Sequence, residues 1–310
     1  MTPTRPAPPR ARRRPNPPRP AERTLVSPLT LAGTRGRLTY RLVLVTVVAS
    51  ATVVFLGPML LAVTGALKPP AELVRTPPTL LPREWRFSTY TEAWGILDLG
   101  HFMWNTFVVV GGAWLFQLGV AVPAAYSLSK LRPVLGRALL GMMLATLMLP
   151  AAALLIPTYL TVADVPLLGL NLLNTPWAIW LPLGANAFNV FVLKRFFDQI
   201  PADLLEAARL DGAGPVQVML RIVLPLSRPI LAVVSILAVV AAWKDFVWPL
   251  VVLQDPQVQT ITVYLARIST DMPLNTLIAG MVISSLPVVA LFLLFQRQII
   301  AGLSAGALKG

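Results

Sequence analysis

Two charged residues, Lys244 and Asp245, lie side by side in a long apolar stretch of this 310-residue sequence. A charge at the centre of a bilayer costs about 2.5–3.5 kcal/mol on insertion scales, so such residues are candidates for a water-filled path. Asn186 and Asn189 lie three residues apart in another apolar stretch, where they would share one helix face. These four residues could contact a polar solute. The charged pair could also be solvated at an outer mouth, and the asparagines could hydrogen-bond between helices, their commoner use.

The residues that enzymes use most are scarce. The chain has no Cys and one His, His101, which excludes a thiol nucleophile and a histidine-cluster metal site. Asp245 is the only acidic residue that we place within an apolar span, so paired intramembrane carboxylates are missing. The sequence also lacks a Gly-x-x-x-x-Gly-Lys-Ser/Thr phosphate-binding motif. We therefore expect neither catalysis nor a cofactor in this chain.

A polar stretch at 193–228 has a regular pattern. Pro201 suits a helix start, Asp203 complements the dipole of the first turn, and Gly212 suits a helix end. A second helix can run from Pro215 to Val223. The pattern predicts two short helices separated by a tight glycine turn. By pattern alone, such a loop could receive a partner or pack on its own bundle.

These residues need a membrane-embedded scaffold. The chain is 56% hydrophobic and 13% charged, whereas soluble domains carry about 25% charged residues. Six segments meet the requirement of about 20 apolar residues for a spanning helix. They are Leu42–Leu67, Asn105–Leu128, Ala138–Leu160, Thr175–Val192, Pro229–Val252 and Thr276–Phe295. The predicted fold class is an all-α integral membrane protein with six transmembrane helices.

The distribution of basic residues predicts the orientation. Residues 1–40 form a basic, Pro- and Arg-rich tail that we expect to be disordered. Residues 41–310 form the membrane domain, with a core at 101–297. With six spans, 20 Lys and Arg residues fall on the side of the termini and five on the other. The positive-inside rule therefore predicts that both termini are cytoplasmic.

The 193–228 loop resembles the signature loop of ABC importer permeases, which reads Glu-Ala-Ala, three residues, Gly, nine residues, Ile, one residue, Leu-Pro. In this sequence the positions are Glu206, Ala207, Ala208, Gly212, Ile222, Leu224 and Pro225. The resemblance extends over residues 41–310. The segments 243–250 and 302–310 resemble the maltose-type permeases of the carbohydrate uptake branch, although the position of Lys244 is more often Asn there.

The resemblance implies a type I importer fold and a loop that docks as a coupling helix on a separate ATPase. The implied docking residues are Glu206, Ala207, Ala208, Asp211 and Gly212. Further contacts with the ATPase would come from the C-terminal residues Ser304, Ala305, Gly306 and Lys309. ATP and Mg²⁺ would bind to the ATPase and not to this chain.

The implied assembly contains a second permease subunit, an ABC ATPase dimer and an extracytoplasmic solute-binding protein. It would lie in a bacterial cell membrane, import a sugar or oligosaccharide, and involve no nucleic acid. The alternatives are an ABC permease for another solute, such as a peptide, polyol or glycerol phosphate, and an ion-coupled secondary transporter. The second alternative needs buried acidic residues as coupling groups, and Asp245 is the only acidic residue that we place within a span.

Overall fold

The computed structural model describes residues 33–307, with side chains as far as residue 296. Two compact units divide the chain, Met1–Met59 and Leu60–Gly310. The described part of the first unit forms most of helix α2 (Thr34–Ala66), which continues to the start of the second unit. Large apolar side chains of α2, such as Val53 and Phe55, are exposed. The predicted disordered tail lies mainly outside the described residues.

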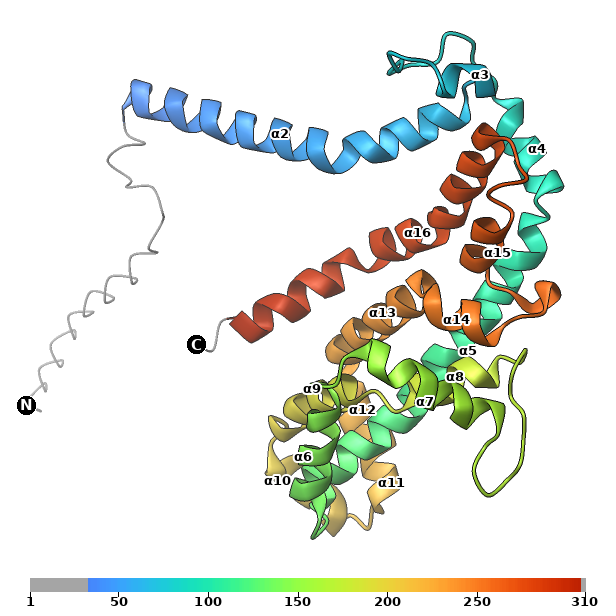
Figure 1. Cartoon of the computed structure of the whole chain (residues 1–310). Coiled ribbons are helices and arrows are strands. Elements are labelled where there is room, and N and C mark those ends of the chain that lie inside the picture. The colour runs from blue at the N-terminus through green and yellow to red at the C-terminus, as the bar shows by residue number, and fades with distance from the viewer. Residues whose placement is uncertain (1–32, 308–310) are drawn as a thin grey trace, which may run out of the picture. The chain divides into compact units, whose positions relative to one another are not determined.

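The second unit is helical (Figure 1). Its elements are α3 (Pro70–Leu73), α4 (Ser88–Ile96), α5 (Leu99–Tyr126), η1 (Ser127–Leu131), α6 (Gly136–Thr146), α7 (Ala151–Ala163), α8 (Trp177–Gly184), α9 (Ala187–Asp198), α10 (Ala202–Leu210), α11 (Pro215–Val218), η2 (Met219–Val223), α12 (Leu224–Leu226), α13 (Arg228–Lys244), α14 (Val247–Val252), η3 (Pro256–Val258), α15 (Ile261–Arg267) and α16 (Leu274–Ala307). Within residues 33–307 the strand-like pairing is one isolated bridge, between Val165 and Leu170. The all-α prediction is confirmed for this part of the chain.

Three helices of the described chain are long and apolar enough to cross a membrane alone: α2, α5 continued by η1, and α16. Two bent pairs would bring the number to five if each pair forms one span. One pair is α6 with α7, and the other joins Pro215–Leu226 to α13. The predicted count of six spans is therefore not confirmed: by length and composition the described helices give three to five.

The interruptions occur where the backbone becomes extended. The predicted span Ala138–Leu160 bends by 109° between α6 and α7, and Pro150 before α7 has an extended ψ of 131°. The predicted span Thr175–Val192 breaks before α9, where Asn186 is extended with a ψ of 104°. An apolar average over a window does not detect one extended residue, so hydropathy alone merges the two halves.

The predicted span Pro229–Val252 also ends early. Helix α13 stops at Lys244, and Asp245 is extended with a ψ of 128° before α14 begins at Val247. Lys244 is exposed and Asp245 is half-buried. Lys244 is thus the last residue of α13 and does not lie inside one helix that continues to Val252.

Three buried clusters follow one another along α5. Near its start, Leu99 and Phe102 pack with α15 and α16. At its middle, Val109 joins a cluster that includes residues of α7, α8 and α14. Near its end, Ala121 and Tyr126 pack with α9, α13 and the 193–228 loop. Figure 1 shows α10 and α11 at one end of α5 and α4 at the other. Helix α5 therefore contributes residues to all three buried clusters.

Helices α5 and α8 approach closely because small residues face large ones. A Cβ at Gly112 of α5 would overlap the indole of Trp180, whose Nε1 donates to the Val109 carbonyl at 2.9 Å. A Cβ at Gly184 of α8 would lie 2.5 Å from the ring of Phe116. The contact is reciprocal: each helix offers a glycine to an aromatic ring of the other. Such close approach is typical of helix packing in membranes.

Candidate functional site

The 193–228 loop, called the coupling loop below, starts from a fixed junction. Asp198, the last residue of α9, accepts hydrogen bonds from Ser129 Oγ at 2.7 Å and Lys194 Nζ at 2.8 Å. Lys130 Nζ donates to the Ile200 carbonyl at 2.9 Å. The end of α5 and the end of α9 are therefore joined immediately before the loop leaves the bundle.

The ionisation of Asp198 reflects these contacts. Burial opposes the charged form, but the hydrogen bonds from Lys194 and Ser129, together with the charge of Lys194, outweigh it and lower the pKa of this carboxyl. Asp198 is consequently a carboxylate at neutral pH, as its role as a double acceptor requires.

Helix α10 is attached to the body by one face. Pro201 precedes its first residue, and Asp203 lies in the first turn, where its charge favours the helix dipole. Leu205 is 5% exposed and enters the same buried cluster as Phe197 and Val218. Ala208 packs against this cluster from the same side, three residues on. The inward face is thus Leu205 with Ala208, whereas Leu204 is exposed.

The predicted glycine turn is present and has a defined hydrogen-bond pattern. Gly212 has a φ of +82°, a conformation that glycine adopts without strain. Its N–H donates to the Arg209 carbonyl at 3.0 Å, and the N–H of Ala213 donates to the Ala208 carbonyl at 2.9 Å. This pair of bonds is the Schellman motif, which ends a helix by satisfying its last carbonyls. The chain can then reverse into α11, where Gly214 N donates to Gln217 Oε1 at 3.1 Å.

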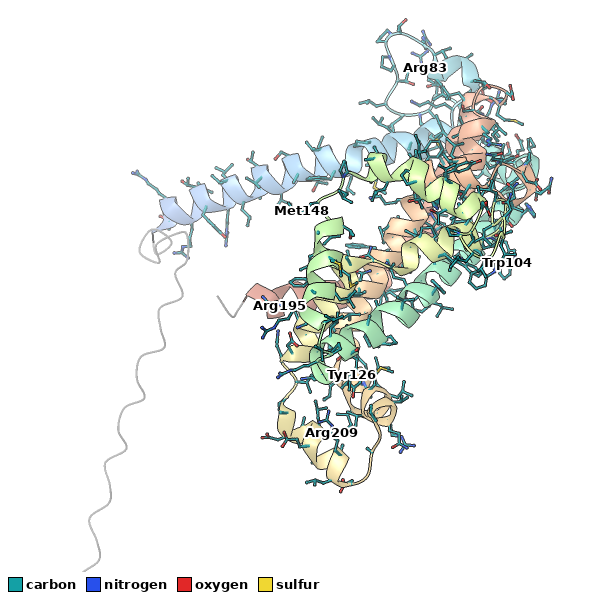
Figure 2. The ribbon with its side chains drawn as sticks, turned by 60° about the horizontal axis from the view of Figure 1, so that its bottom comes forward. Arg83, Trp104, Tyr126, Met148, Arg195 and Arg209 are labelled. Carbon is teal, nitrogen blue, oxygen red and sulfur yellow. The ribbon has the colours of Figure 1, made fainter. Side chains whose placement is uncertain are left out.

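Four of the predicted docking residues lie on the outer face of this hairpin. Glu206, Ala207, Asp211 and Gly212 are exposed, and we call these four the docking face. Ala208 differs, because it is half-buried and faces the body. Within the described residues the Glu206 side chain forms neither a hydrogen bond nor an ion pair. Figure 2 shows Arg209, also on α10, beyond the end of α5 that Tyr126 marks. The outer face can therefore be reached by another protein.

The polar residues predicted for a path fall into separate places. Asn186 and Asn189 line one cavity of about 300 Å³, together with Gln117 and Trp114 of α5. Asn186 Oδ1 accepts from the Asn189 N–H at 3.0 Å and so caps α9 instead of bonding between helices. Gln117 Nε2 does bond between helices, donating to the Leu183 carbonyl of α8 at 3.1 Å.

Asp245 lines a different cavity, of about 480 Å³, with residues of α7, α8 and α14. Its Oδ1 accepts weakly from the Trp248 N–H at 3.5 Å. Lys244 lines neither cavity. The structure thus brings the two asparagines together but does not place Lys244 or Asp245 with them.

Sequence reasoning missed Trp114. Its indole Nε1 is buried and has no hydrogen-bond partner among the described residues, although it borders the cavity that Gln117 and the asparagines line. The available signal was the spacing of Trp114 and Gln117, three residues apart in one span, which places them on one helix face. An unpaired buried donor at a polar cavity is suited to a solute oxygen.

The C-terminal contact residues remain a prediction. Ser304, Ala305 and Gly306 fall in the last turns of α16, but their side chains lie outside the described part of the chain, and Lys309 lies outside it altogether. No group of three or more His, Cys, Asp or Glu side chains that could hold a metal occurs in the described residues.

Apolar helices long enough to cross a membrane, the 193–228 loop with its glycine turn and a cavity bordered by amide side chains are together typical of a membrane transport protein. Comparisons with known proteins agree. Residues 117–304 match the family described as "Binding-protein-dependent transport system inner membrane component". The chain is 32% identical over 237 residues to the melibiose/raffinose/stachyose import permease protein MelC of Bacillus subtilis, covering 74% of this chain and 84% of the relative. It is 31% identical over 243 residues to the sn-glycerol-3-phosphate transport system permease protein UgpE of Agrobacterium fabrum, covering 75% and 84%.

Solved structures show the same fold. A subunit of a bacterial ABC transporter involved in alginate import has a TM-score of 0.76 at 24% identity, covering 86% of this chain and 98% of that one. A subunit of an alginate transporter in complex with a periplasmic protein has a TM-score of 0.59 at 16% identity, covering 86% and 96%. The chain belongs to the family of inner membrane components of binding-protein-dependent transport systems. It is a multi-pass permease subunit of the inner membrane, as the signature loop predicted.

Proposed function

We propose that this chain is the permease subunit through which a separate ATPase drives the import of a sugar or sugar-like solute. The proposal rests on the docking face, which lies on α10 and in the turn that follows it. Its four residues are exposed, and Leu205 attaches α10 to the same buried cluster as the ends of α5 and α9. ATP and Mg²⁺ would bind to the ATPase.

The coupling step follows from this attachment. When the ATPase subunits close, a force on α10 reaches the bundle through Leu205 and through the Ser129–Asp198 junction. Because packed interiors resist compression, a displaced helix moves its neighbours instead of deforming. Helix α5, which lines the polar cavity, would tilt with α10 and switch its access between the two sides. In this proposal six spans, three of them broken, place both termini in the cytoplasm.

The solute class rests on the relatives and on the cavity. MelC imports melibiose, raffinose and stachyose by its name, and UgpE transports glycerol phosphate. The cavity of Gln117, Asn186 and Asn189 offers uncharged donors and acceptors, together with the Trp114 Nε1 donor. Neutral amides suit hydroxyl groups, so we favour a sugar. A glycerol phosphate would need basic residues, and none lines this cavity in the described chain.

The assembly would contain a second permease subunit, an ATPase dimer and an extracytoplasmic solute-binding protein. The family description names binding-protein dependence, and one alginate transporter structure holds a periplasmic protein.

The test is Glu206→Lys in the reconstituted importer. We expect the variant to insert normally but to lose most ATPase capture and uptake, because the charge reversal lies on the docking face. Glu92→Lys is the matched control: Glu92 is exposed on α4, at the other end of α5, so ATPase capture should be unchanged. Normal capture and uptake by Glu206→Lys would reject the docking role. Uptake that an uncoupler abolishes, but vanadate does not, would favour the secondary transporter.

A further inference from the structure

We propose that a basic cavity beside the start of the coupling loop binds the phosphate headgroup of an anionic phospholipid. The cavity has a volume of about 710 Å³ and is formed by η1, the start of α6 and the second half of α9. Its charged lining residues are Lys130, Arg132, Arg137, Lys194 and Asp198. No residue of α10 lines it. Ser129, Lys130 and Arg132 also border a smaller neighbouring cavity, which Glu206 of the docking face lines.

The cavity has unbalanced positive charge. Lys194 is paired with Asp198 at 2.8 Å, and Lys130 is held by the Ile200 carbonyl. Arg132 and Arg137 have no acidic partner among the described residues. Two guanidinium groups therefore remain for an anion. Arginine is suited to phosphate because its planar fork can donate two parallel hydrogen bonds.

The backbone presents Arg132 at a fixed place. Arg132 has a φ of 49°, and its N–H donates to the Ser127 carbonyl at 2.9 Å, which ends the π-helical turn η1. Its side-chain Nε donates to the Ser129 carbonyl at 3.4 Å. These contacts occupy the backbone N–H and Nε, so the terminal guanidinium nitrogens are left for a ligand.

The surroundings favour a lipid over a free anion. Between the two arginines, Val134 is fully exposed and Leu135 is largely exposed. Pro133 and Leu140 add apolar surface inside the cavity itself. Arginines that flank exposed apolar side chains match an interface where headgroups meet acyl chains. A free phosphate would gain nothing from Val134, Leu135 or Leu140.

The position beside α9 gives the lipid a consequence. Lys194 and Asp198 both line the cavity and form the junction that precedes α10. A bound phosphate near Lys194 would compete with Asp198 for this cation. Lipid binding would therefore weaken the Lys194–Asp198 ion pair, which lies where the bundle meets the coupling loop. This inference rests on the proposed cytoplasmic orientation of the coupling loop.

Lipid retention tests the site without any transport assay. The complete importer is assembled in nanodiscs with equal phosphatidylcholine and phosphatidylglycerol and moved into detergent, and retained lipids are counted by native mass spectrometry. We expect retained phosphatidylglycerol in the wild type and the loss of at least one per copy of this chain in Arg132→Gln/Arg137→Gln. The charge-conserving Arg132→Lys/Arg137→Lys should retain it. Arg221→Gln/Arg228→Gln, which removes two exposed arginines outside the cavity, is the matched control.

Arginine labelling distinguishes the possible occupants. Phenylglyoxal modification of Arg132 and Arg137 is measured in phosphatidylcholine nanodiscs, with added phosphatidylglycerol, millimolar inorganic phosphate, or the ATPase. Protection by phosphatidylglycerol alone supports the proposal. Equal protection by inorganic phosphate would overturn the lipid assignment, and protection by the ATPase alone would identify a protein contact instead. Unchanged lipid retention in Arg132→Gln/Arg137→Gln would overturn the site, leaving the proposed import function unaffected.

Discussion

Ser129 in η1, which continues α5, and Asp198 at the end of α9 are joined by a hydrogen bond of 2.7 Å. The second carboxylate oxygen of Asp198 accepts from Lys194 at 2.8 Å, so both oxygens are used. One carboxylate thus connects the helix that lines the polar cavity to the helix that leads into the coupling loop. The connection is local, charge-assisted and open to titration.

Asp198→Asn should flatten the acid limb of the stability profile. The folded pKa of Asp198 is lowered, so its contribution is present above the unfolded value of about 3.9 and is lost as pH falls through the folded pKa. At neutral pH the loss should stay below about 1 kcal/mol, because the pair is partly exposed. The measurement is Tm in detergent from neutral pH downwards. Asp203→Asn is the control, and identical profiles for wild type and Asp198→Asn would contradict the assignment.

Gly112→Ala should destabilise the contact between α5 and α8. The added methyl group would overlap Trp180, and overpacking of this kind costs about 1–3 kcal/mol. Gly111→Ala is a close control, because a Cβ there has no atom within 4 Å. Thermal unfolding of the two purified variants makes the comparison. If Gly112→Ala matched Gly111→Ala in Tm, the close approach would be wrong.

Gly212→Ala should weaken coupling while leaving membrane insertion intact. A side chain at a φ of +82° is strained, at a cost of about 1–2 kcal/mol, and the Schellman turn that orients α10 would open. Gly214→Ala is the control, since its φ of −70° is ordinary and nothing lies within 4 Å of a Cβ. ATP-dependent uptake per inserted protein is the readout. Equal uptake by both variants would show that the turn does not orient the docking face.

Trp114→Phe separates a solute contact from a packing role. Its Nε1 has no partner in the described structure, so the change should not lower Tm. If a solute oxygen uses this N–H, KM should rise by roughly 5-fold, which corresponds to about 1 kcal/mol for one hydrogen bond. Trp180→Phe, which loses a bond to the Val109 carbonyl, should lower Tm instead. An unchanged KM for Trp114→Phe would remove this residue from the solute path.

The coupling loop was the most predictable part of the molecule. The sequence pattern predicted the places of three residues. Pro201 precedes the first residue of α10, Asp203 lies in its first turn, and Gly212 forms the turn after its end. Local chemistry decides such features. The inward side of α10 was less predictable, because Leu205 and not its neighbour Leu204 is buried, and only the body of the protein determines which leucine faces it.

The breaks in the apolar helices were not predictable from hydropathy. Asn186 was expected inside the fourth span, yet it caps α9, where the helix is interrupted. Lys244 was expected within a span, yet it ends α13. In both places one extended residue interrupts the helix. Neighbouring helices and side chains can satisfy the backbone groups that such an interruption frees. Trp114 was missed for a similar reason, because its missing partner is visible only in three dimensions.

The 109° bend between α6 and α7 interrupts the helix and yet keeps its backbone N–H groups hydrogen-bonded. At the bend, Leu147, Met148 and Leu149 are exposed in an apolar stretch whose helix is interrupted. The N–H groups of these three residues donate to the carbonyls of Leu144, Ala145 and Thr146. Lipid offers no hydrogen bonds to a backbone, so the turn supplies them from within the chain. The bend can therefore face lipid without a partner for these N–H groups.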